Sequence, residues 1–126
     1  MTHDEIDTMA AGLEMDVAVA RAMGCDVRPT PQGWSPRGFY CACDHPNFEQ
    51  PPHGVEPDWD CDPYLKHYST DIAAAWDVVK WLLANGHHLE IEDGWSCVIL
   101  TANICGTGET APEAICRAAL EVVADA

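Results

Sequence analysis

One segment of the sequence is rich in residue types that bind transition metals. Its cysteines and histidines are Cys41, Cys43, His45, His53 and Cys61. Structural zinc sites use four thiolate or imidazole ligands in a tetrahedron, so the three cysteines with either histidine would complete one. The alternative is packed or free thiols, because Cys-x-Cys is less typical of zinc sites than Cys-x2-Cys and cysteine is a common small buried residue. The sequence therefore predicts a candidate zinc site over residues 41–61.

The other reactive side chains show no pattern typical of an active site. A nucleophilic cysteine needs a base beside it. His67, His87 and His88 could serve, but chance pairings are easy among seven cysteines and six histidines. Glu90 and Glu92 alternate along a predicted strand, which is typical of its solvent face. We therefore predict no catalytic residue, and we expect four cysteines to lie in the core: Cys25, Cys97, Cys105 and Cys116.

The chain is strongly acidic, with 21 acidic and 6 basic side chains and a net charge of −15. This charge repels phosphate, so we expect no direct contact with DNA or RNA. The turn over residues 106–110 contains glycines but no lysine, and it carries Glu109, so it is not expected to bind phosphate. The acidic surface either only keeps the protein soluble or docks onto a basic protein, and we expect the partner to be a protein.

The sequence also suggests a location. No apolar run approaches the roughly 18–20 residues needed to cross a bilayer, and the N-terminal residues lack the basic start and apolar stretch of a secretory signal. We therefore expect a cytoplasmic protein without membrane contact. In that compartment its seven cysteines are expected as thiols or metal ligands in preference to disulfides.

Helical periodicity occurs in three regions. The first opens with a capping box at residues 2–5, is interrupted at Gly12 and continues over residues 13–23. The second is capped by Ser69 or Thr70 and ends at residues 85–86. The third follows a capping box at residues 110–113. One buried face of the second helix is expected to hold its apolar residues: Ile72, Ala75, Trp76, Val79, Leu82 and Leu83.

Strand patterns are fewer. Residues 88–92 alternate, Asp93-Gly94 is typical of a two-residue hairpin turn, and residues 95–100 return as the second strand. Residues 25–28 are a candidate third strand, and the glycines of residues 106–108 break the pattern. The predicted fold is α+β: a small β-sheet, made of the hairpin and the candidate third strand, packed with about three helices in α/β/α sandwich-like layers.

Residues 30–67 differ from the rest of the chain. Eight of the nine prolines fall within residues 29–67. Proline removes a backbone donor and fixes φ, so no long helix or central strand is expected there. The segment also holds many aromatic residues, which is typical of an ordered irregular loop. We therefore expect one domain over residues 1–126, with a scaffold of residues 1–29 and 68–126 and a proline-rich irregular excursion over residues 30–67.

Three blocks of the scaffold resemble a known family. They are Met23-Gly24, the stretch YSTDIAAAW over residues 68–76, and ETAP followed by AICRAAL over residues 109–120. These blocks resemble the phage ABA sandwich domain, a family of phages and prophages named for its layers of sheet and helix. The resemblance implies the fold and a phage or prophage origin. It implies no assigned activity and transfers no functional residue.

Together these observations favour a non-enzymatic phage accessory protein that acts through protein–protein contacts. A zinc-stabilised binding module that uses the loop over residues 41–61 is one alternative. An acidic decoy that inhibits a nucleic-acid-binding host defence protein is another, and a small hydrolase is the enzymatic alternative. The sequence predicts neither the partner nor the oligomeric state.

Overall fold

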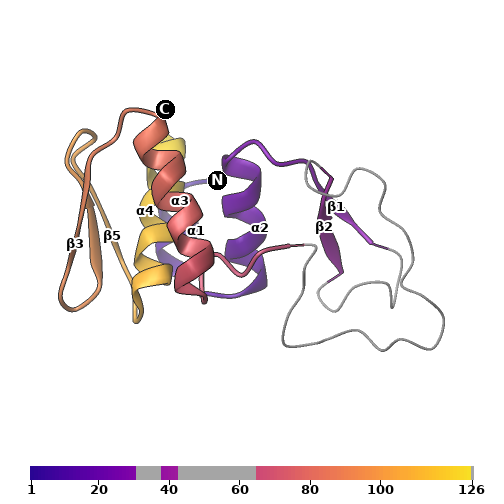
Figure 1. Ribbon diagram of the computed structural model, residues 1–126. Helices are drawn as coiled ribbons and strands as arrows, with labels where there is room; N and C mark the ends of the chain where they lie inside the picture. The colour runs from indigo at the N-terminus through magenta and orange to yellow at the C-terminus, as the bar shows by residue number, and fades with distance from the viewer. Residues whose placement is uncertain (31–37, 43–64, 126) are drawn as a thin grey trace.

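The computed structural model describes residues 1–30, 38–42 and 65–125 (Figure 1). The helices are α1 (His3–Thr8), α2 (Leu13–Ala22), α3 (Ile72–Ala84) and α4 (Ala111–Asp125). The strands are β1 (Val27–Pro29), β2 (Phe39–Cys41), β3 (Leu89–Glu92), β4 (Ser96–Ile99) and β5 (Ile104–Thr107). The predicted α+β class is confirmed. Most of the proline-rich excursion lies outside the described residues.

The predicted hairpin forms β3 and β4 of a three-stranded antiparallel sheet in the order β3-β4-β5. Its third strand is β5, where the sequence predicted a break, since Gly106 lies inside the strand. A Cβ atom on Gly106 would lie 2.4 Å from the backbone nitrogen of Ala118 in α4. Glycine therefore allows strand and helix backbones to approach closely at this point.

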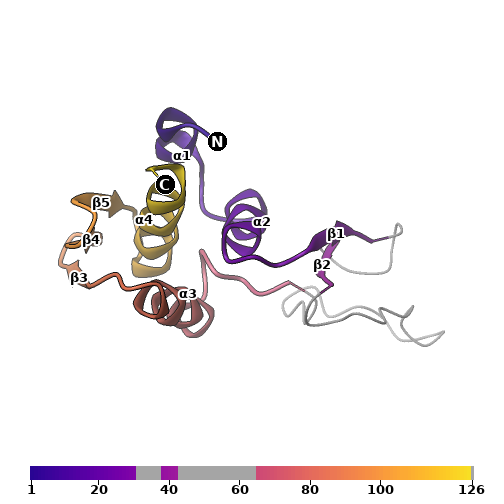
Figure 2. The same cartoon turned by 90° about the horizontal axis from the view of Figure 1, so that it is seen from above.

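The candidate strand before Pro29 exists but belongs to another sheet. It forms β1, which pairs with β2 in a two-stranded antiparallel sheet through Val27↔Cys41 and Pro29↔Phe39. Figures 1 and 2 show this small sheet on the far side of the helices from β3, β4 and β5. The predicted residues are therefore extended, but they do not complete the hairpin sheet.

Helix α4 is the centre of the domain. Its buried residues run from Ala111 to Glu121 with few gaps, and it contacts α1, α2, α3, β4 and β5. Figure 2 shows all four helices on the same side of the three-stranded sheet. The sheet face turned away from them carries exposed Glu90, Glu92 and Thr107. Among the described residues, that face has no helix over it.

Two buried polar groups connect the helices. The guanidinium of Arg117 donates to the carbonyl oxygens of Ile6 (3.2 Å), Met9 and Thr107, and it lies 3.0 Å from the Glu113 carboxylate. The Met9 carbonyl follows the last turn of α1, where carbonyls have no donor within the helix, and the Ile6 carbonyl also accepts the backbone N–H of Met9 at 3.2 Å. The short first helix is thus anchored to α4 by a charged group with several partners.

The second group is Asp16 of α2, which is fully buried. One oxygen of its carboxylate accepts hydrogen bonds from both the backbone N–H and the hydroxyl of Ser69, each at 2.7 Å. The expectation that Ser69 or Thr70 caps the following helix is therefore wrong. Asp71 is the N-cap of α3 and accepts from the backbone N–H of Ala73. Ser69 instead fixes the entry of α3 against α2.

Candidate functional site

The predicted zinc ligands are only partly within the described residues. Cys41 lies on β2, and its sulfur forms a disulfide with Cys25. Cys43, His45, His53 and Cys61 lie outside the described residues. Zinc binds the thiolate form of cysteine, so Cys41 could join such a site only after reduction of this disulfide. Within residues 1–30, 38–42 and 65–125, no cluster of three or more His, Cys, Asp or Glu side chains is placed to hold a metal. The zinc site stays a prediction.

The expectation of thiols rather than disulfides is wrong for Cys25 and Cys41. Pairing of β1 with β2 brings their Cα atoms to 6.1 Å, a separation typical of disulfides. Sequence reasoning missed this disulfide because Cys25 and Cys41 come close only when β1 pairs with β2, and β2 is a strand inside the proline-rich excursion.

The remaining described cysteines, Cys97, Cys105 and Cys116, are free. Cys97 and Cys116 are buried as predicted, whereas Cys105 is exposed on the open face of the sheet, opposite Val98. Burial raises the pKa of Cys97 to about 11 and raises the pKa of Cys116 well above its ordinary value. Both thiols therefore stay protonated at neutral pH, and neither is an activated nucleophile.

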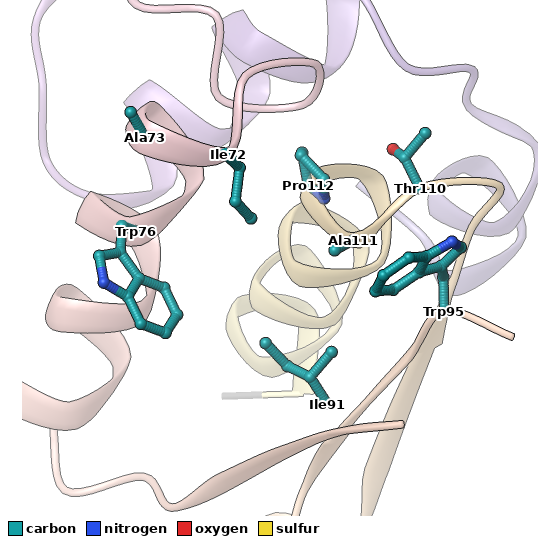
Figure 3. Close-up of a pocket in the computed structure, with 8 residues that line it drawn as sticks. All are labelled: Ile72, Ala73, Trp76, Ile91, Trp95, Thr110, Ala111 and Pro112. Carbon is teal, nitrogen blue, oxygen red and sulfur yellow. The ribbon is translucent and has the colours of Figure 1, made fainter. Parts of the chain in front are cut away.

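The described surface carries an apolar groove of about 710 Å³, which we call the α3–β3 groove (Figure 3). One wall is formed by the first half of α3, the other by the end of β3 and the following turn, and the floor by the start of α4. The lining residues are Ile72, Ala73, Trp76, Ile91, Trp95, Thr110, Ala111 and Pro112. The volume falls within the range typical of small-molecule sites.

The large side chains of this groove are unusually exposed. Ile72 is 54% exposed, Trp76 52%, Trp95 44% and Ile91 37%. The prediction that Ile72, Trp76 and Leu83 are buried is therefore wrong, while Ala75, Val79 and Leu82 are buried as predicted. The apolar stripe of α3 is wider than the surface that α4 covers. The sheet stops at β3, so no described strand lies over the rest of the stripe.

Trp95 reaches the groove from a strained backbone position. Glu92 pairs with Ser96, so Asp93, Gly94 and Trp95 form a three-residue turn instead of the predicted two-residue turn. Trp95 has φ +54°, in the left-handed region that favours glycine. A side chain in this region costs roughly 1–2 kcal/mol. Residues held in such conformations cluster at functional sites, and this one places an indole at the groove (Figure 3).

The surroundings of the groove are acidic. None of its lining residues is charged, but exposed carboxylates adjoin several of them in the chain. Asp71 and Glu109 precede Ile72 and Thr110, while Glu90 and Glu92 flank Ile91 and project to the opposite face of the sheet. An apolar groove with an acidic border is suited to an apolar group that carries positive charge beside it.

The lining also limits the chemistry of the groove. Its side chains include one hydroxyl, that of Thr110, and no titratable group. General acid–base and nucleophilic catalysis both require such groups at the reacting atoms. The groove can therefore bind an apolar segment, but its lining offers no means of catalysing proton transfer or covalent chemistry.

Sequence reasoning placed two of the groove's large residues, Ile72 and Trp76, on a buried face of the helix. One signal was present in the sequence. The stripe of α3 contains two large residues, Ile72 and Trp76, beyond the set that one neighbouring helix can cover.

Comparison with known proteins supports the resemblance noted above. The family model of the phage ABA sandwich domain matches residues 19–120, about four-fifths of the chain, and the matched range includes every residue that lines the groove. No curated protein and no solved structure matches the chain. In the part of the chain that the structure describes, no helix has both the length and the hydropathy to span a membrane.

Proposed function

Because the chain belongs to the phage ABA sandwich domain family, we propose that it is a phage or prophage accessory protein that acts by binding another protein and catalyses no reaction. The α3–β3 groove is the binding site in this proposal. The observation that carries the proposal is the convergence of two tryptophans and two isoleucines, each 37–54% exposed, on one groove. Clustered exposed apolar side chains mark interaction sites, and tryptophan is enriched among the residues that dominate binding energy.

The charge of the chain supports a basic protein as the partner. With a net charge of −15, the chain repels nucleic acid and attracts cationic surfaces at long range. A decoy that occupies the nucleic-acid site of a host defence protein is the second candidate, favoured by the same charge. A decoy would lose affinity steeply as salt rises, because exposed charge pairs are screened. Binding that depends mainly on the apolar groove would lose much less affinity as the salt concentration rises.

We place this activity in the bacterial cytoplasm, where the Cys25–Cys41 disulfide would be kept reduced. Trapping thiols with an alkylating reagent at lysis tests that location. Alkylation of both cysteines in protein from infected cells is expected, whereas an intact disulfide in the trapped protein would contradict a cytoplasmic site of action.

Site-specific photo-cross-linking tests the binding function. A photo-reactive phenylalanine analogue replaces Ile72 in one variant and Leu83 in a matched control. The two positions are on α3 and are 54% and 51% exposed, but only Ile72 lines the groove. In infected or lysogenic cells we expect a cross-linked protein from position 72 and none from position 83. Equal cross-linking at both positions, or none at position 72, would refute the groove as the binding site.

A further inference from the structure

The three-stranded sheet covers α4 but leaves Ile72 and Trp76 of α3 exposed. Strands β4 and β5 pack on α4, and α3 packs beside α4. Figure 2 shows β3 as the strand on the α3 side of the sheet. Strand β3 pairs with β4 on one side and with no other described strand. The groove lies where a fourth strand beside β3 would cover Ile72 and Trp76.

The backbone of β3 can accept such a strand. The N–H of Leu100 donates to the carbonyl of His88 at 2.8 Å, and hydrogen-bonded pairs alternate with non-bonded pairs along an antiparallel ladder. Glu90 and Glu92 therefore bond toward β4. The N–H and C=O groups of Leu89 and Ile91 point away from β4, along the sheet edge. The side chain of Ile91 lines the groove at the same point.

We propose that an extended segment of the partner protein adds to β3 as a fourth antiparallel or parallel strand and covers the α3–β3 groove. This inference rests on the proposed function and specifies how the partner binds. Main-chain hydrogen bonds to Leu89 and Ile91 supply affinity, and alternate side chains of the added strand supply specificity.

The side chains around β3 define the chemistry of that segment. A residue opposite Ile91 projects to the same sheet face, toward Trp76 and Pro112, so it must be apolar. Its neighbours project to the opposite face beside Glu90 and Glu92, where opposite charges stabilise cross-strand pairs. The partner segment therefore alternates valine, isoleucine or leucine with lysine or arginine.

A second copy of this chain is a poor occupant of the same edge. Pairing of two β3 strands would bring Glu90 and Glu92 of one copy beside the same glutamates of the other, and like charges across a strand pair are destabilising. Each copy also carries a net charge of −15, which opposes association over a longer range. The charge pattern thus favours a basic segment from a different protein.

Three synthetic peptides test the strand addition. The first is an acetylated heptapeptide that alternates lysine and valine. The second has glutamate in place of lysine. The third keeps the lysines and valines but has N-methyl groups on alternate amides of one edge, which removes donors without changing charge. The readouts are the dissociation constant, from titration calorimetry, and hydrogen exchange at the backbone amides of Leu89 and Ile91.

We expect the lysine peptide to bind and to slow exchange at both amides. N-methylation and glutamate replacement should each weaken binding at least about tenfold, and so should Trp76→Ala in the protein. Leu83→Ala should leave binding within about twofold. The N-methylated peptide makes the test independent of any effect of substitution on folding.

Other outcomes would overturn the inference. They are no binding at about 1 mM peptide, equal binding of the N-methylated peptide, and unchanged exchange at Leu89 and Ile91. If hydrogen exchange at these two amides slows as the protein concentration rises in the absence of peptide, the edge of β3 binds a second copy of the chain instead. If position 72 still cross-links a protein while the peptide test fails, the proposed function stands and strand addition is refuted. If position 72 gives no cross-link, the proposed function itself fails.

Discussion

Truncation of Ile72 to alanine should weaken partner binding without unfolding the protein. Full burial of an isoleucine side chain contributes about 1.5–3 kcal/mol. Ile72 is 54% exposed, so its buried part contributes roughly 0.7–1.4 kcal/mol to folding. Its exposed part, once covered by the partner, would contribute roughly 0.8–1.6 kcal/mol to binding. The dissociation constant should therefore rise about 4- to 14-fold.

Leu83→Ala is the matched control for this variant. Leu83 lies on the same helix and is 51% exposed, but it does not line the groove. Its truncation should lower the free energy of unfolding by a similar amount and leave the dissociation constant unchanged. Trp76→Ala should have a larger effect than Ile72→Ala, since half of a larger side chain remains to be covered.

Two measurements on each variant check this reasoning. Urea unfolding gives the change in folding free energy. Titration calorimetry gives the change in dissociation constant, either for the partner protein identified by cross-linking or for the lysine–valine peptide. If Leu83→Ala weakens binding as much as Ile72→Ala, the groove is not the site. If Ile72→Ala leaves the dissociation constant within twofold of the original chain, the exposed surface of Ile72 is not covered on binding.

Three further predictions concern the scaffold. Gly106→Ala should lower the unfolding free energy by about 1–3 kcal/mol or more in urea, since its Cβ would meet the backbone of Ala118 at 2.4 Å. His3→Gln should flatten the pH dependence of the melting temperature. The pKa of His3 is raised from 6.5 by its hydrogen bond to Glu121, so the stability from this pair is complete below about pH 6.5 and is lost as pH rises through the raised pKa. Arg117→Met should lower the unfolding free energy by about 3–5 kcal/mol in urea, because it removes the ion-pair partner of the mostly buried Glu113 carboxylate and the side-chain donor to the carbonyls of Met9 and Thr107.

A specific result would contradict each of these three predictions. If Gly106→Ala leaves the unfolding free energy within about 0.5 kcal/mol of the original chain, the close approach of β5 and α4 is not a constraint. Parallel pH profiles for His3→Gln and the original chain would show that the His3–Glu121 pair does not contribute to stability. Full stability of Arg117→Met would show that α1 is held by other contacts.

Local sequence signals predicted the starts of α1 and α4 and the break at Gly12, but not the N-cap of α3. Thr2 accepts the N–H of Glu5 at the start of α1, and Gly12 separates α1 from α2. Thr110 accepts the N–H of Glu113 at the start of α4. Each of these signals acts within four residues of the chain, so the surrounding fold has little influence on it. The family resemblance came from the same regions, whose residues mostly start helices or pack in the core.

The sequence did not predict contacts between distant segments. Gly106 fits within β5 because the strand backbone there lies close to Ala118, twelve residues later in the chain. From the local sequence alone, a glycine predicts the end of a strand. The exposure of Trp76 depends on how many strands the sheet contains, which helix periodicity does not report. The groove could therefore not be located before the sheet was known, although the width of the α3 stripe indicated a surplus of apolar residues.

The contacts of α1 have a consequence for how members of the family diverge. The family match covers residues 19–120, so α1 and the last turn of α4 are among the segments outside it. These two unmatched segments contact each other, since His3 pairs with Glu121 and with Asp125. We expect the two ends to be inherited or lost together, and His3 to co-vary with the acidic residues at positions 121 and 125. A homologue without α1 should carry a shorter α4, because Glu121 and Asp125 would then lack His3 as a partner.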